Sequence, residues 1–147
     1  DVVSEYAGAG RWGPPGAAFK WWTKWLWSGE YDFVVGKGQD VHSGKYSAGI
    51  VCVGDAGRAA IFTPNLKAAE AGDTYELTVF IKGEGKNKVR IYMEGTVSAS
   101  KTLTAEPKWT RVTITGKAAK AGGSFRVYID ALGKGVFYVD DMKLVRK

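Results

Sequence analysis

Apolar and polar residues alternate along most of this chain with the period of two that is typical of β-strands. Every second residue is apolar from Tyr75 to Ile81 and again from Phe125 to Ile129, so we expect both segments to face one core. Turn residues, mainly glycine, separate such segments at intervals of roughly ten residues. We expect strands at 2–6, 19–27, 30–35, 46–53, 58–63, 74–82, 88–94, 100–104, 109–115, 124–131 and 136–145. The pattern predicts an all-β fold, an antiparallel β-sandwich of the jelly-roll type.

The densest aromatic stretch is Phe19–Trp27, which holds four of the six tryptophans interleaved with two lysines. A strand is favoured here because a helix would scatter the indoles around its axis. In that strand we expect Trp22 and the two lysines to face outward and the remaining tryptophans to pack inward, namely Trp21, Trp25 and Trp27. The inverted phase stays open, and it would make this run, including Trp25, the principal binding site.

Trp12 lies in the loop that precedes this run, which is rich in glycine, alanine and proline. Such a ring is either a lid on the edge of the core or a binding ring, since loops often carry function.

Length and composition are those of one globular domain, 1–147, with 45% hydrophobic and 24% charged residues. No apolar run reaches the roughly 18 residues that a membrane span needs. The only cysteine, Cys52, lies in an apolar stretch and is expected to be a small buried residue. Because the chain starts at Asp1, we expect it to be a module excised from a larger protein.

The net charge of +6 favours an acidic partner such as an anionic polysaccharide, nucleic acid or a membrane surface. No block of like charges distinguishes these three.

Two of the predicted strands carry the same outward-facing triplet of arginine, tyrosine and acid. The first is Arg90, Tyr92 and Glu94, and the second is Arg126, Tyr128 and Asp130. A pyranose could rest its C–H face on a tyrosine ring while its hydroxyls bond to the arginines and carboxylates. The alternative is a solvated face with cross-strand ion pairs worth a few tenths of a kcal/mol each.

Two other functions have weaker support from the sequence. Single-strand nucleic-acid binding would suit the basic charge and exposed rings, but Glu94 and Asp130 would repel phosphate. Catalysis has little support, because His42 is the only histidine and a paired-carboxylate cleft cannot be recognised. A small polysaccharide lyase that uses Tyr92 or Tyr128 as its base is the remaining enzymatic alternative.

Four motifs occur in order along the chain: 42–47 (HSGKYS), 71–77 (AGDTYEL), 109–112 (WTRV) and 137–144 (FYVDDMKL). Together they resemble the jelly-roll carbohydrate-binding modules of the family 4/9/16/22 type, which share a galactose-binding-like sandwich. The resemblance implies a secreted or cell-surface module that is attached to a polysaccharide-degrading enzyme and holds it on its substrate.

The resemblance also implies a structural calcium ion, held by oxygen ligands, and a buried ring at Trp109. The implied calcium ligands are the carbonyls of Ser43 and Lys45 and the carboxylates of Asp141 or Asp140 and Glu5.

We therefore expect a monomeric, non-catalytic domain that binds a polysaccharide, which the basic charge suggests is an acidic glycan. The expected ligand-binding residues are Tyr92, Tyr128, Arg90, Arg126, Glu94, Asp130, Trp22, Trp12 and Trp25.

Overall fold

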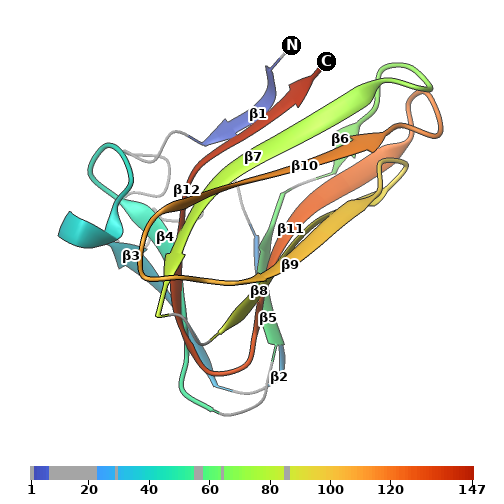
Figure 1. The fold of residues 1–147 in the computed structure, drawn as a ribbon. Helices are drawn as coiled ribbons and strands as arrows, with labels where there is room; N and C mark the ends of the chain where they lie inside the picture. Colours follow the sequence, from blue (N-terminus) through green and yellow to red (C-terminus); the bar gives the residue numbers. More distant parts are fainter. Residues whose placement is uncertain (1, 7–22, 29, 55–57, 64, 85–86) are drawn as a thin grey trace.

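A computed structural model of the chain describes residues 2–6, 23–28, 30–54, 58–63, 65–84 and 87–147. The described residues form two antiparallel sheets packed face to face (Figure 1). Sheet A has the strand order β10-β7-β12-β4-β3, and β1 pairs with β12 beside it. Its strands are β1 (Val2–Tyr6), β3 (Tyr31–Gly36), β4 (Ser47–Cys52), β7 (Thr74–Gly83), β10 (Thr110–Lys117) and β12 (Gly135–Arg146).

Sheet B has the order β2-β5-β11-β8-β9, with β6 paired to β11. It consists of β2 (Thr23–Ser28), β5 (Arg58–Phe62), β6 (Leu66–Lys67), β8 (Lys88–Gly95), β9 (Ala99–Thr104) and β11 (Ser124–Leu132). A short 3-10 helix, η1 (Gly38–Asp40), follows β3. No helix among these described residues is long and apolar enough to cross a membrane. The antiparallel β-sandwich predicted from the alternation is confirmed.

The core lies between the sheets and is built from the alternate apolar residues of each long strand. Leu77, Ile81, Ile91, Ile129 and Phe137 are each no more than 2% exposed. Because side chains alternate across a strand, the residues between these positions form the two outer faces of the sandwich.

Two smaller predictions have different outcomes. Cys52 is buried, 4% exposed, as expected of a small apolar residue. Trp109 was expected in the core, but it is only half-buried and lies edge-on to His42, 5.6 Å between ring centroids. It precedes β10 and packs against the outer side of sheet A, so that expectation was wrong.

Candidate functional site

The two triplets predicted from the sequence lie directly opposite each other on the outer face of sheet B. Strands β8 and β11 are antiparallel neighbours, so the triplets run in opposite directions and each arginine faces an acid. The register pairs are Arg90 with Asp130, Tyr92 with Tyr128, and Glu94 with Arg126. The sequence predicted both sets, and the register brings them together in one patch.

Three aromatic rings stack side by side across this face, with Tyr128 in the middle. We call them the aromatic row: Phe62, Tyr128 and Tyr92. The Tyr128 ring lies 4.7 Å from Tyr92 with an angle of 4° between the planes, and 5.3 Å from Phe62 with an angle of 24°. Arg90 Cζ lies 4.1 Å from the Tyr92 ring centroid, and Arg126 Cζ lies 5.3 Å from that of Phe62. Since neighbouring strands are about 4.8 Å apart, parallel rings at this spacing stand on edge to the sheet.

The aromatic row therefore does not present the ring faces that we expected a pyranose to use. Both faces of Tyr128 are covered by rings, and Tyr92 is only 5% exposed. What the patch offers to a ligand is ring edges, guanidinium groups and the Glu94 carboxylate, which is exposed. Recognition here would be mainly polar.

Asp130 points to this outer face but is fully buried, 0% exposed. Arg58 covers it, donating from Nε at 2.9 Å and from Nη2 at 2.5 Å to Asp130 Oδ2, and from Nη2 at 3.2 Å to the Tyr92 hydroxyl. Asp130 Oδ1 is buried and has no hydrogen-bond partner within the described part of the chain. Burial raises the pKa of Asp130 even though the bonds from Arg58 act to lower it.

Burial also raises the pKa of Tyr92 to about 12, and the charge of Asp130 adds to the rise. A general base at neutral pH needs the opposite shift, so the phenol would have to lose its proton readily. Tyr92 is thus held protonated, which gives no support to the lyase alternative.

Sequence reasoning missed three residues of this patch. Arg58 and Phe62 belong to β5, and Asn65 Oδ1 accepts a hydrogen bond of 2.9 Å from Arg126 Nε. The alternation could have identified Arg58 and Phe62, because Ile61 lies in the core and the residues on the other side of the same strand must then face outward.

The tryptophan run is only partly described. Trp12, Trp21 and Trp22 lie outside the described residues. Residue 25 of β2 is the register partner of Ala60, which is itself the partner of Asp130. The side chains of β2 lie outside the described part of the structure, so the direction of the Trp25 ring stays a prediction.

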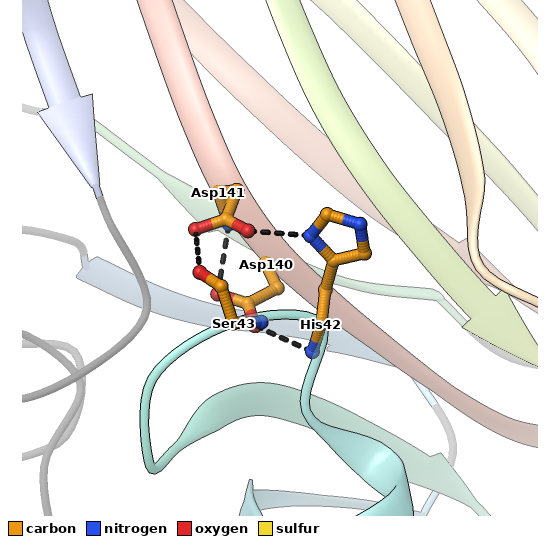
Figure 2. Close-up of polar contacts among 4 residues, drawn as sticks. All are labelled: His42, Ser43, Asp140 and Asp141. Carbon is orange, nitrogen blue, oxygen red and sulfur yellow. Dashed lines mark hydrogen bonds and ion pairs between the residues drawn. The ribbon is translucent and has the colours of Figure 1, made fainter.

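A second polar cluster joins the loop after η1 to β12 on sheet A (Figure 2). Asp140 Oδ2 accepts hydrogen bonds from the backbone N–H groups of His42 at 2.8 Å and Ser43 at 3.1 Å, and its Oδ1 accepts from Asp141 N–H at 2.8 Å. Asp141 contacts His42 Nδ1 at 2.5 Å and accepts from Ser43 Oγ at 2.6 Å. Asp141 lies in a bulge of β12 with φ of 48°.

This cluster lies where the resemblance implies calcium, and its fit is partial. Ser43 and Asp141 supply oxygen atoms of the kind that calcium takes, whereas Asp140 is 0% exposed and already holds three backbone N–H groups. Lys45 is exposed, and Glu5 is paired in register with Lys143 of β12. In the part of the chain that the structure describes, no group of three or more His, Cys, Asp or Glu residues converges on one point. Asp141 and Ser43 remain the residues that could hold the ion.

Comparison of the sequence with models of known protein families, and with curated proteins, gives no match. The fold does match solved structures. It is similar to TmCBM61 in complex with β-1,4-galactotriose, with a TM-score of 0.70, 16% identity, and 88% of this chain and 90% of that chain covered. It is also similar to the CBM22-1–GH10 modules of the Clostridium thermocellum xylanase Xyn10B complexed with xylohexaose, with a TM-score of 0.61, 14% identity, and 100% and 29% covered.

A third structure is the enzymatically active domain of the bacteriophage CBA120 tailspike protein 4, with a TM-score of 0.73 and 8% identity. The match covers 97% of this chain but only 22% of that one. The chain thus has the jelly-roll sandwich fold of carbohydrate-binding modules, which confirms the fold implied by the sequence resemblance.

Proposed function

We propose that this domain binds a polysaccharide through the outer face of sheet B and catalyses no reaction. The observation that carries the proposal is the pair of facing arginine-tyrosine-acid triplets, which places two half-buried arginines and the exposed Glu94 carboxylate around the aromatic row. Carbohydrate complexes of proteins with the same fold support it.

The finer proposal is that the polymer is an acidic glycan. Arg90 and Arg126 can each form two parallel hydrogen bonds to a uronate carboxylate. The ring faces of the aromatic row are already covered, so a neutral sugar would gain little stacking there. The net charge of +6 would add a salt-dependent attraction.

By the same proposal the domain is a secreted, monomeric module that keeps an attached carbohydrate-active enzyme on its substrate. The solved CBM22-1–GH10 pair is an example of such a covalent arrangement in another protein.

Affinity gels that contain neutral or uronate-rich polymers test the proposal directly. We expect retention by the uronate polymer, weakened by salt, and about tenfold weaker binding by Arg126→Ala, the loss expected for one charge-assisted hydrogen bond. Tyr128→Phe keeps the stack and removes only the hydroxyl, so any loss it shows measures polar recognition. Lys117→Ala, an exposed cation of sheet A, is the matched control. Retention by no polymer, with tight binding of single-stranded DNA, would overturn the proposal.

We also propose that Asp141 and Ser43 contribute to a calcium site. Calcium at about 100 times its dissociation constant would stabilise the fold by about 2.7 kcal/mol, so a chelator should lower the melting temperature by about 5–10 °C. Asp141→Asn should abolish that difference. Equal melting temperatures with and without chelator would remove the proposal.

A further inference from the structure

The outer face of sheet A carries a separate hollow, on the opposite side of the sandwich from the aromatic row. Its volume is about 230 Å³, which is smaller than the pockets that hold drug-sized ligands. It is lined by Asp40, Lys82, Gly83, Glu84, Val136 and Tyr138. None of these residues takes part in the site proposed above.

The Tyr138 ring packs directly against the backbone of two glycines of the sheet, Gly36 and Gly49. Tyr138 is the register partner of Gly49 on β4 and of Lys82 on β7. A Cβ atom on Gly49 would lie 2.8 Å from Cδ1 and Cε1 of the ring, and a Cβ on Gly36 would lie 2.8 Å from Cδ1. The ring can lie flat against the sheet only because Gly36 and Gly49 lack a side chain, and in this position it forms one side of the hollow.

The opposite rim, formed by η1, is also held in place. Ser47, which is fully buried, donates from Oγ to the Asp40 carbonyl. Lys82 Nζ donates to the Gln39 carbonyl at 2.7 Å and lies 3.4 Å from Asp40 Oδ1. The Asp40 carboxylate is therefore positioned before any ligand arrives, which reduces the entropy lost on binding.

The polar groups of the hollow suit a neutral polyhydroxylated ligand. Two carboxylates, Asp40 and Glu84, accept hydrogen bonds from hydroxyl groups, and Lys82 donates. Their formal charges sum to −1, so an anion is disfavoured here, unlike on sheet B. Burial raises the pKa of Tyr138, and the charge of Asp40 adds to the rise. The phenol thus keeps its proton and remains a donor.

We propose that this hollow is a second carbohydrate site that takes a single neutral pyranose unit. The Tyr138 ring and Val136 would contact the apolar side of the sugar, and the Asp40 and Glu84 carboxylates would accept its hydroxyl hydrogen bonds. The inference rests on the proposed function only in that the ligand is a glycan, because the two sites share no residue.

Titration of the whole domain with methyl glycosides of neutral sugars, followed by amide NMR, tests this inference. We expect saturable shifts at 36–40, 82–84 and 136–138, and no such shifts with a methyl glycoside of a uronic acid. Glu84→Gln should weaken binding about tenfold, the effect of removing one charged acceptor. Arg126→Ala on the opposite face should leave these shifts unchanged.

Gly49→Ala gives a second test, since its new Cβ would displace the Tyr138 ring and abolish the shifts. If that variant does not fold, Glu84→Gln alone decides. Saturable shifts only around Tyr128, or no saturable shift with any neutral glycoside, would overturn the inference. If no affinity gel retains the domain while the neutral glycosides still cause these shifts, the sheet B proposal is overturned and this one stands.

Discussion

Arg58→Met is expected to lower the free energy of unfolding by about 3 kcal/mol at pH 7, the low end of the range for breaking a buried ion pair. Arg58 donates two hydrogen bonds to Oδ2 of the Asp130 carboxylate, which is 0% exposed and whose other oxygen has no hydrogen-bond partner among the described residues. Methionine keeps much of the side-chain bulk but removes the donors. The effect lies at the low end because the arginine side chain is 37% exposed and water can partly replace it. Urea unfolding monitored by tryptophan fluorescence measures the change.

The loss of unfolding free energy caused by Arg58→Met should become smaller as the pH falls. Burial already raises the pKa of Asp130, and loss of the arginine would raise it further. A carboxyl group whose pKa is raised by folding costs stability above that pKa, and the cost disappears as the pH falls toward the unfolded value of about 3.9. As the pH falls from 7 toward that value, the stability of the variant should therefore approach that of the wild type.

Asp130→Asn is the matched control, because it removes the buried charge and leaves the half-exposed Arg58 in contact with water. It should cost less than Arg58→Met, and the double variant should be more stable than Arg58→Met alone. Equal losses from the two single variants, or a deficit that does not change with pH, would contradict this account of the pair.

The sequence predicted the sandwich and the outward triplets because both depend on alternation within one strand. Core residues at every second position of β7 and β11 fix which residues remain for the outer faces. Arg126 and Tyr128 were thus assigned to an outer face without knowledge of any neighbouring strand.

Features that depend on cross-strand register could not be predicted in this way. Arg58 is 72 residues from Asp130 along the chain, and no local pattern shows that its guanidinium reaches that carboxylate. The same holds for the aromatic row, since only the register of β5, β11 and β8 shows that its rings cover one another. Exposure of Tyr92 was therefore overestimated, although its outward direction was predicted correctly.

Asp140→Ala is expected to lower the free energy of unfolding by about 3 kcal/mol, because hydrogen bonds to a charged group contribute about 1.5–3 kcal/mol each and are not additive. The carboxylate accepts from three backbone N–H groups and joins the loop at 42–43 to β12, which lies 98 residues further along the chain from His42. Alanine leaves those donors without their acceptor, so the loop should open locally and the amide protons of His42 and Ser43 should exchange faster.

Asp32→Ala, an exposed acid of β3, is the control and should change stability by no more than about 0.5 kcal/mol. Asp140→Asn should fall between the two, because its single carbonyl oxygen can still accept while its NH₂ group meets another donor. If Asp140→Ala unfolds like Asp32→Ala, and the exchange of the His42 and Ser43 amides is unchanged, the carboxylate does not hold this loop. Asp40, on the rim of the sheet A hollow, ends η1 directly before this loop, so loosening the loop should also weaken neutral glycoside binding there. That second loss would come from disorder of the rim, because Asp140 does not line the hollow.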